Sequence, residues 1–552
     1  MHYLENKLID SNLFGKLDIN FAKYIGEPVN MDEGVGDVAQ FLAAMVSKAR
    51  HEGYVSIGLR ETFEVAKDYF SAALKLTNYE AWLEAINRVP AIGVPGSNKP
   101  LICFKQNLYL QKYWIYENNV YSTLKTMSQI KLDIVDKDKF NENLMFVYGQ
   151  ESVGSDNQQR KAAIKAAQNK LTIITGGPGT GKTTTLTSIL YLYKEQFPKA
   201  KIALLAPTGK ASQRITEAMQ AAVAKLKIKS AFSEISTSTI HRMLGYRYNS
   251  PFFKHNENNP LNYDLIVIDE ASMIDIALMS KLLMAFSTNT RLILVGDKNQ
   301  LSSVEAGSFF GAFCINQSFE DNIINLTKNW RFGEDSGIGQ LSQEIQSGKS
   351  IAELLPIFES YNDINHLKLD KDTVLNIVDK YIENYYQKIV TEPDITKAIN
   401  LINTSRILCV FNEGLFGATK INSLIKRVLI ERGYVSRTDQ IYNNLPILIT
   451  KNDYNLGLFN GDTGLIRATQ SGELRAFFIK EDGQQRSYAP AMLPSYLPLY
   501  AMTIHRSQGS EFQEVIIILP KSENMRTSKE LLYTAITRSK KRVLVMTPEA
   551  SK

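Results

Sequence analysis

The chain has 552 residues, of which 44% are hydrophobic and 22% are charged, and its formal net charge is +6. This composition is typical of globular proteins and excludes a disordered or fibrous chain, and the length predicts about three or four domains. The mildly basic balance permits a polyanionic partner but does not establish one. The three cysteines lie far apart and the six histidines are scattered, so we expect reduced thiols and no zinc site. The charged start and the lack of a long apolar run predict a cytoplasmic protein without a membrane segment.

Residues 1–145 carry no catalytic motif and are predicted to form an α-rich domain. The apolar residues between Val38 and Val46 recur at helical spacing, and Gly53 stands where a helix would end. The aromatic-rich segment 108–121 allows two interpretations, packing inside a small domain or stacking on the bases of a single strand, and packing is favoured. We expect this domain to serve as a docking surface.

The next stretch is an apolar run at Leu171–Ile174, which reads as a buried strand, followed by a glycine-rich turn and a helix. The turn fits the pattern G-x-x-x-x-G-K-[ST] of a phosphate-binding loop, in which glycines let backbone N–H groups close around phosphates. Lys182 is expected to reach the β- and γ-phosphates of ATP, and the Thr183 hydroxyl to bind Mg²⁺. The nucleotide-binding residues predicted in this stretch are Gly176, Gly177, Pro178, Gly179, Thr180, Gly181, Lys182, Thr183 and Thr184.

Residues suited to nucleotide hydrolysis follow two later strands. The apolar run 264–268 ends in Asp269 and Glu270. We expect Asp269 to help hold Mg²⁺ and Glu270 to activate the attacking water as a general base. Gln300 follows the strand 291–295 and is placed to sense the γ-phosphate.

The second half of the chain reads as another α/β unit. Apolar runs at Ile407–Phe411 and Pro446–Ile449 predict strands of this unit, and the segment 465–490 alternates like short antiparallel strands. Arg331 and Arg538, each in a motif next to a predicted strand, are candidates for arginine fingers.

Taken in order, these motifs resemble those of the superfamily 1 helicases, over residues 159–541. The motifs are GGPGTGKT, APTGKA, TIHRML, VIDEASM, VGDKNQL, NWRF, TIHRSQGSEF and YTAITRSKK. Further segments are similar to the RecD subunits of the bacterial RecBCD enzyme, exodeoxyribonuclease V: NPLNYDLIVIDEASMID, ILCVFNEGLFGATKIN, ITKNDYNLGLFNGDTG and the amino-terminal FLAAMVSKARHEGYVSIGL.

The resemblance implies an α/β fold with two RecA-like P-loop motor domains, at residues 146–320 and 321–552, and ATP between them. It also implies that Arg331 and Arg538 reach the phosphates from the second motor domain. A small SH3-like β insertion would occupy about residues 450–498.

The resemblance further implies roles for residues outside the phosphate-binding loop. Gln159 would recognise adenine, and Glu511 would lie near the nucleotide and link it to the DNA site. The chain would travel 5′→3′ on single-stranded DNA, act at duplex DNA ends, and assemble with RecB-like and RecC-like subunits through its amino-terminal domain. The residues in motifs that line the single-strand track are Thr208, His241, Thr503 and His505.

The sequence departs from the family pattern at three positions. Ser302 stands where proline is common, Trp330 where tyrosine is frequent and Arg506 where lysine is frequent. The last two changes roughly keep aromatic character and charge, so we expect activity to be retained, although arginine and lysine differ in how they hold phosphates. Two alternatives stay open, a stand-alone 5′→3′ helicase and a non-enzymatic subunit that uses the motor as a scaffold. The acidic residues left over from the motifs form no cluster with a lysine, so we expect no nuclease site.

Overall fold

The computed structural model describes residues 2–26, 33–74, 78–149, 157–226, 235–247, 250, 252–301, 306–333, 335–453, 455–479, 483–520 and 528–548. Ser302, one of the departures from the family pattern, lies outside these ranges. No helix within them combines the length and the apolar character that a membrane crossing requires.

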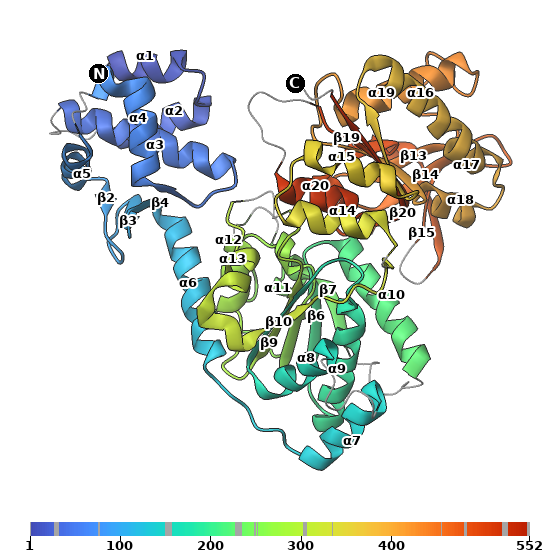
Figure 1. Ribbon diagram of the computed structural model, residues 1–552, viewed down its shortest axis with the longest axis horizontal. Coiled ribbons are helices and arrows are strands. Elements are labelled where there is room, and N and C mark those ends of the chain that lie inside the picture. Colours follow the sequence, from blue (N-terminus) through green and yellow to red (C-terminus); the bar gives the residue numbers. More distant parts are fainter. Residues whose placement is uncertain are drawn as a thin grey trace.

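The first motor sheet is built from β5 (Leu171–Gly176), β6 (Ile202–Ala206), β7 (Ser236–Thr239), β8 (Leu265–Ile268), β9 (Arg291–Gly296) and β10 (Ile323–Leu326). All its strand pairs are parallel, in the order β10-β5-β9-β8-β6-β7 (Figure 1). The surrounding helices are α8 (Gln158–Gln168), α9 (Lys182–Gln196), α10 (Gly209–Leu226), α11 (Ile240–Leu244), α12 (Ile276–Met284) and α13 (Phe310–Ile315).

Helices cover both faces of this sheet, which is why its central strands are continuous apolar runs. Ile173 and Leu205 pack toward α12 and α13, whereas Ile174 and Leu204 pack toward α8, α9 and α10. The strand predicted at Leu171–Ile174 is therefore confirmed. The sheet also extends past residue 320, the end predicted for the first motor domain, because β10 pairs with β5.

The amino-terminal unit contains α1 (His2–Asp10), α2 (Lys16–Gly26), α3 (Glu33–His51), α4 (Leu59–Leu74) and α5 (Tyr79–Arg88). A small sheet joins them, made of β1 (Ser56–Gly58), β2 (Ile92–Gly93), β3 (Leu101–Phe104) and β4 (Asn107–Leu110). These elements share one core, and Gly53 has a φ of +90° after the end of α3, as a residue that ends a helix requires.

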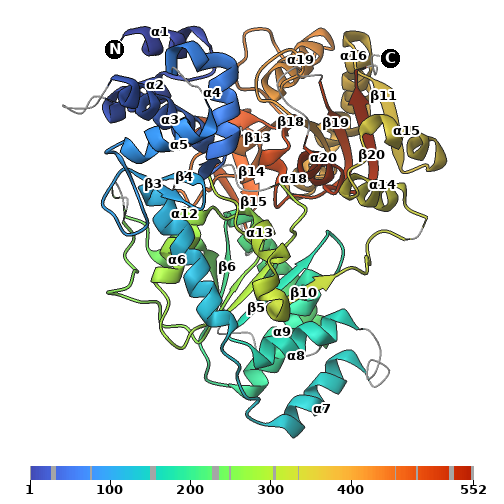
Figure 2. The ribbon, with the colours of Figure 1, turned by 60° about the vertical axis from the view of Figure 1, so that its left-hand side comes forward.

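Two further helices connect this unit to the first motor sheet, α6 (Gln111–Ser128) and α7 (Lys137–Tyr148). Val120 and Leu124 of α6 pack in one core of the motor sheet, and Phe140 of α7 packs in the other. Figures 1 and 2 show α6 running from the amino-terminal unit along the first motor domain. The packing thus divides the chain before α6, earlier than the predicted boundary at residue 145. It also supports the packing interpretation of the aromatic segment 108–121, since Tyr113 and Tyr116 lie against the motor core.

The second motor sheet is built from β11 (Ile364–Lys368), β12 (Ser405–Cys409), β18 (Ala501–Thr503), β19 (Phe512–Ile518) and β20 (Ser539–Thr547). Its pairs are parallel, in the order β11-β20-β19-β12-β18. Its helices are α14 (Gly337–Gln346), α15 (Ile351–Ser360), α16 (Lys371–Tyr381), α17 (Gln387–Thr391), α18 (Ile395–Ile402), α19 (Ala418–Glu431) and α20 (Lys529–Ile536). With a phosphate-binding loop after β5 and helices around both sheets, the chain has the predicted α/β fold of two RecA-like units.

A separate antiparallel sheet contains β13 (Leu445–Ile449), β14 (Thr463–Ala468), β15 (Leu474–Ile479), β16 (Gln485–Tyr488) and β17 (Tyr496–Pro498). The short antiparallel strands predicted within 465–490 are confirmed. The assignment of Pro446–Ile449 to the second α/β unit is wrong, because β13 pairs in antiparallel fashion with β14 and β17. An apolar run alone does not distinguish these two sheets, because β13 is as completely buried in the antiparallel sheet as β12 is in the parallel one.

Candidate active site

The phosphate-binding loop connects the end of β5 to the start of α9. Gly179 and Gly181 have φ angles of +81° and +83°, in the left-handed region that favours glycine. A Cβ atom on Gly179 would lie 2.4 Å from the Cβ of Arg331, and one on Gly181 would lie 2.3 Å from Nε2 of Gln159. Glycine is therefore required at both positions, because of the backbone conformation and because neighbouring side chains leave no room for a Cβ atom. Its free N–H groups at the start of α9 suit an anion.

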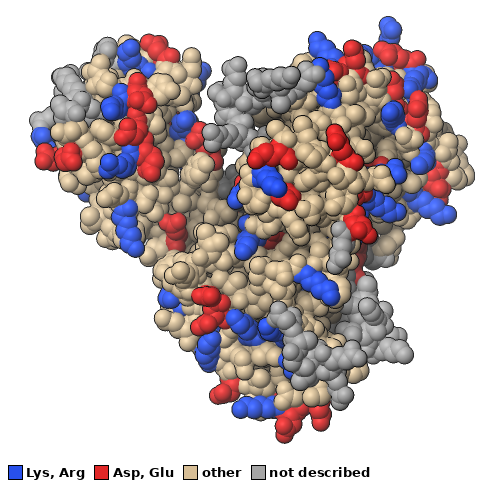
Figure 3. Space-filling model, in the orientation of Figure 1, with Lys and Arg blue, Asp and Glu red and all other residues tan. Residues whose placement is uncertain are grey.

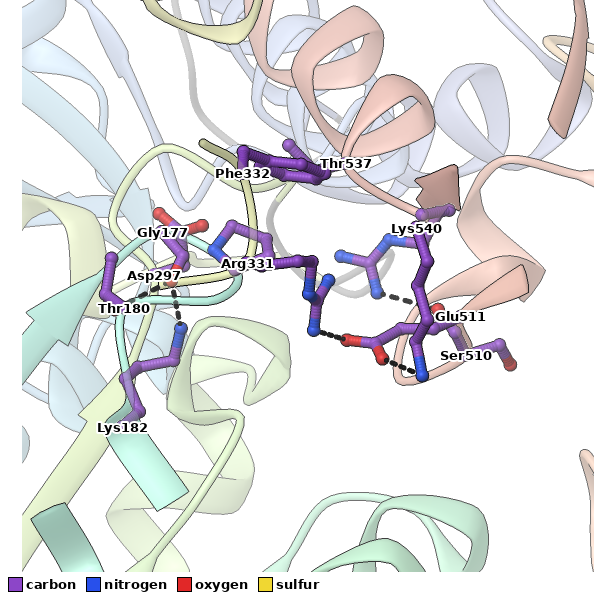
Figure 4. Close-up of polar contacts among 12 residues, drawn as sticks. Gly177, Thr180, Lys182, Asp297, Arg331, Phe332, Ser510, Glu511, Thr537 and Lys540 are labelled. Carbon is purple, nitrogen blue, oxygen red and sulfur yellow. Dashed lines mark hydrogen bonds and ion pairs between the residues drawn. The ribbon is translucent and has the colours of Figure 1, made fainter. Parts of the chain in front are cut away.

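Lys182 is the first residue of α9 and bends back over the loop. Its ammonium donates a hydrogen bond of 2.6 Å to the carbonyl oxygen of Gly176. It donates another of 3.0 Å to the carbonyl oxygen of Gly177 (Figure 4). The ammonium is thus held within the cradle in which a bound phosphate would meet it.

The two predicted carboxylates follow β8. Asp269 is 8% exposed, and its Oδ1 accepts a hydrogen bond of 2.8 Å from the backbone N–H of Glu270. Glu270 has a φ of +52°, an unfavourable backbone conformation for a residue other than glycine. Such strain is typical of functional positions, and here it belongs to the residue predicted to activate water.

These residues line a cleft of about 410 Å³ between the two motor sheets. Most of the nucleotide-site residues predicted from the sequence contribute to its wall. The first motor unit contributes Pro178, Gly179, Gly181, Lys182, Thr183, Thr184, Asp269, Glu270 and Gln300. The segment after it contributes Arg331, and the second unit contributes Glu511 and Arg538. Trp330, which was not among the predicted residues, also lines the wall. Gln159 lies beside this wall, with its amide against Gly181. Thr180 is buried within the loop, where its hydroxyl donates to the carbonyl of Gly177 at 2.8 Å.

A buried hydrogen-bond network connects the two motor units at the floor of this cleft. Arg538 is 3% exposed, and its Nη2 donates to Oε1 of Gln300 at 2.6 Å. Nε2 of Gln300 in turn donates to Oδ2 of Asp297 at 3.1 Å. Burial raises the pKa of Asp297, whereas the nearby Lys182 ammonium lowers it. The predicted sensor and the predicted arginine finger are therefore joined before either contacts a nucleotide.

Arg331 differs from the expectation that it reaches over from the second motor domain. The backbone N–H of Trp330 donates to the carbonyl of Gly179 at 2.8 Å, and Nδ2 of Asn329 donates to the carbonyl of Pro178 at 3.0 Å. These bonds attach the segment to the phosphate-binding loop of the first unit.

The Arg331 side chain nevertheless spans the cleft. Its Nη2 lies 2.6 Å from Oε1 of Glu511, and Lys540 lies 3.1 Å from the other oxygen of that carboxylate (Figure 4). Glu511 thus ties the loop-bound arginine to the second motor unit, beside the nucleotide site as the resemblance implied.

Sequence reasoning missed three residues of this site, Asp297, Trp330 and Tyr533. Trp330 is 62% exposed in the cleft wall, and the Lys328 ammonium lies 4.1 Å from its ring centroid. An exposed aromatic face beside the amide of Gln159 can stack on a base. All three lie in motifs that the sequence shows, Trp330 in NWRF, Asp297 in VGDKNQL and Tyr533 in YTAITRSKK, so motif membership was the signal, although it assigned them no role.

A second cleft, also of about 410 Å³, lies between the first motor unit, the second motor unit and the antiparallel sheet. It brings together Thr208 and His505, two of the residues predicted to contact DNA. Its described lining contains Lys210, Arg406 and Arg506 and no aspartate or glutamate. Charges of both signs are scattered over the face of the molecule seen in Figure 3, whereas the charged residues in the described lining of this cleft are all cations. An acid-free cationic cleft suits a phosphodiester backbone.

The other two predicted DNA contacts lie outside this lining. His241 is on α11, with its ring centroid 5.8 Å from that of Phe253. Thr503 ends β18, and its hydroxyl oxygen accepts a hydrogen bond of 3.4 Å from the backbone N–H of Arg506. Thr503 is thus connected to the cleft by one hydrogen bond, because its partner Arg506 lines the cleft.

Family models match the chain over three stretches. They are described as an AAA domain at residues 159–306, a UvrD-like helicase C-terminal domain at 498–546, and the N-terminal domain of RecBCD enzyme subunit RecD at 10–109. The last match ends just before α6, where the packing also divides the chain.

Similar proteins include RecBCD enzyme subunit RecD of Buchnera aphidicola subsp. Acyrthosiphon pisum, which is 31% identical over 98% of this chain and 96% of its own length. RecBCD enzyme subunit RecD of Mycolicibacterium smegmatis is 34% identical over 93% of this chain and 90% of its own length. The ATP-dependent RecD2 DNA helicase of Deinococcus radiodurans is 28% identical over 70% of this chain but only 48% of its own length.

Proposed function

Because this chain belongs to the family of RecBCD enzyme subunit RecD, we propose that it is the ATP-dependent 5′→3′ DNA helicase subunit of a RecBCD-type exodeoxyribonuclease V. In that role it acts at duplex DNA ends in double-strand break repair and recombination, in the cytoplasm, together with RecB-like and RecC-like subunits. The observation that carries the proposal is the cleft that unites the phosphate-binding loop and the carboxylates of one motor unit with Arg538 of the other.

The residues of this cleft fit ATP and Mg²⁺. Lys182 and the N–H groups at the start of α9 would hold the phosphates, and Thr183 and Asp269 would hold the metal. The described residues contain no cluster of three or more histidines, cysteines or carboxylates that could hold a metal. Proteins commonly bind Mg²⁺ through one or two side chains together with substrate phosphates, as Thr183 and Asp269 would do here. ATP supplies the phosphoanhydride bond whose hydrolysis drives movement.

Each remaining residue has a role that its position supports. Glu270 would take a proton from the attacking water, and Gln159 and Trp330 would hold the base. Arg331 and Arg538 would stabilise the negative charge of the transition state. For this, the Arg331 side chain would leave Glu511 and bind a phosphate, and the Arg538 side chain would leave Gln300 and do the same. Closure of the cleft and hydrolysis would therefore be coupled.

The second cleft would carry the single strand. Lys210 and Arg506 supply positive charge at this cleft, and Thr208 supplies a hydroxyl. Arg406 adds charge from within the wall, since it is 1% exposed. Contacts to phosphates bind without reading sequence, as a translocating motor requires.

A stand-alone helicase is the competing role. The subunit is favoured by the match of residues 10–109 to the N-terminal domain of RecBCD enzyme subunit RecD. The RecD subunit of Buchnera aphidicola is also 31% identical over 98% of this chain, against 28% over 70% for the RecD2 helicase. The amino-terminal unit, matched by the RecD N-terminal model, would form the docking surface for partners.

Unwinding by the purified chain tests the proposal. One duplex carries a 5′ single-stranded tail and another a 3′ tail, each with and without ATP. We expect ATP-dependent opening of the 5′-tailed duplex alone. Opening of the 3′-tailed duplex alone would contradict the proposed direction, and opening of neither with intact ATP hydrolysis would indicate a motor that works only inside its complex.

A further inference from the structure

Tyr533 of the second motor unit inserts its side chain into the nucleotide site of the first. It lies on α20 and is 2% exposed. Its hydroxyl donates a hydrogen bond of 3.1 Å to Oδ2 of Asp297, which directly follows β9. A Cβ atom added to Gly177 would lie 2.8 Å from the same hydroxyl oxygen. One hydroxyl of the second unit therefore contacts both the phosphate-binding loop and a buried carboxylate of the first.

Asp297 needs this donor because it is 1% exposed and a buried carboxylate is costly without hydrogen bonds. Tyr533 and Gln300 both donate to Oδ2, and the backbone N–H of Asn299 donates to Oδ1 at 3.0 Å. If Gln300 turned to a γ-phosphate, Tyr533 would remain the side-chain donor to Oδ2.

The same helix holds the Asp297–Leu301 segment at two further points. Oγ1 of Thr534 accepts a hydrogen bond of 2.7 Å from the backbone N–H of Leu301, and Arg538, just beyond α20, binds Gln300. A shift of α20 would therefore reach Gln300 by two routes, through Arg538 directly and through Tyr533 and Asp297.

We propose that Tyr533 is a positioning residue that couples the two motor units, by holding Asp297 so that Gln300 can exchange Arg538 for the γ-phosphate. This inference rests on the proposed helicase function. Lys182 adds to the coupling, because its ammonium bonds to the carbonyl of Gly177, the residue beside which the Tyr533 hydroxyl lies. Movement of that ammonium onto a phosphate would change the surroundings of both Asp297 and the Tyr533 hydroxyl.

The test compares Tyr533→Phe with the native full-length chain in ATP hydrolysis and in unwinding of the 5′-tailed duplex. We expect kcat with DNA to fall about tenfold, the effect of one lost hydrogen bond to a charged group, while KM for ATP stays within about twofold. The number of base pairs opened per ATP should also fall. Tyr500→Phe is the matched control, because it removes a buried hydroxyl that bonds to Tyr442 in the same unit, away from the nucleotide site.

A second variant separates positioning from a structural role. If Tyr533 acts through Asp297, the double variant Tyr533→Phe/Asp297→Asn should be no slower than Asp297→Asn alone, because residues that act as one unit are not additive. Multiplied effects in the double variant would overturn the inference. So would a rise in KM at unchanged kcat, or a lower thermal midpoint with unchanged base pairs per ATP. Failure of the native chain both to hydrolyse ATP and to open any tailed duplex would instead contradict the helicase function.

Discussion

The two clefts of this molecule have the same volume, about 410 Å³, but opposite kinds of lining. The nucleotide cleft mixes carboxylates with cations, and one such pair, Arg331 with Glu511, already spans it. The second cleft has cations and no carboxylate in its described lining. The first lining suits ATP hydrolysis, which needs a general base, ligands for a metal and cations that stabilise a developing negative charge. The second suits binding of a polyanion and no more.

The comparison predicts that damage to one cleft leaves the function of the other largely intact. Substitutions in the nucleotide cleft should abolish ATP hydrolysis without loss of DNA binding. Substitutions in the second, cationic cleft should weaken DNA binding without loss of the ATP hydrolysis that occurs in the absence of DNA.

The largest effect is expected from Glu270→Gln. Removing the general base should lower kcat for ATP hydrolysis about a thousandfold, while the affinity for ATP and for a single strand stays within about threefold. Steady-state hydrolysis and equilibrium binding measure these quantities. Glu257→Gln, at an exposed position of the same motor unit, is the matched control. Near-native turnover of Glu270→Gln would show that another group activates the water.

Lys182→Gln should lower DNA-stimulated hydrolysis several hundredfold, because it removes the cation that meets the phosphates. Binding of an oligonucleotide, followed by fluorescence anisotropy, should be unchanged within about twofold. Lys199→Gln, an exposed lysine beyond α9, should leave both quantities unchanged. Normal turnover in the Lys182 variant would contradict the assignment of the phosphate-binding loop.

The sequence placed the chemistry of the first cleft better than the binding surface of the second. A motif fixes Lys182 at a helix start and Asp269 at a strand end, and parallel strands bring both to one edge. Arg406 precedes an apolar run and reads as the flank of a strand, yet the structure buries it to 1% exposure, with Nη2 donating to the carbonyl of Ile402 at 2.8 Å.

Contacts between distant segments account for most of what sequence reasoning could not reach. The Tyr533 hydroxyl meets Asp297 only because the two motor sheets pack together. Likewise, the choice between the parallel and the antiparallel sheet for Pro446–Ile449 depended on partners far along the chain. Local patterns carry no information of this kind.

In the cationic cleft, the double variant Lys210→Gln/Arg506→Gln should weaken single-strand binding about tenfold at physiological salt. The slope of log affinity against log salt should become shallower by about 1.4, since each phosphate contact on a single strand contributes about 0.7. Hydrolysis without DNA should be unchanged. Lys397→Gln/Arg427→Gln removes two exposed cations of the second motor unit as a control. An unchanged slope of log affinity against log salt would show that the single strand does not bind in this cleft.

The smallest effect concerns His505 and pH. Burial lowers the pKa of this imidazole, so protonation of His505 requires a lower pH than protonation of an ordinary histidine. Acidification from pH 7 to about 5.5 should therefore strengthen single-strand binding in the native chain about twofold more than in His505→Asn. Equal pH dependence of the two proteins would mean that His505 does not face the strand.

Photocrosslinking tests the division of labour between the clefts most directly. A single-stranded oligonucleotide with 5-iodouracil at successive positions is irradiated with the full-length chain, and the modified peptides are mapped by mass spectrometry. The account predicts adducts in the peptides that contain Thr208 and His505, in the native chain and in Lys182→Gln alike. Adducts confined to the nucleotide cleft or to the amino-terminal unit would contradict it.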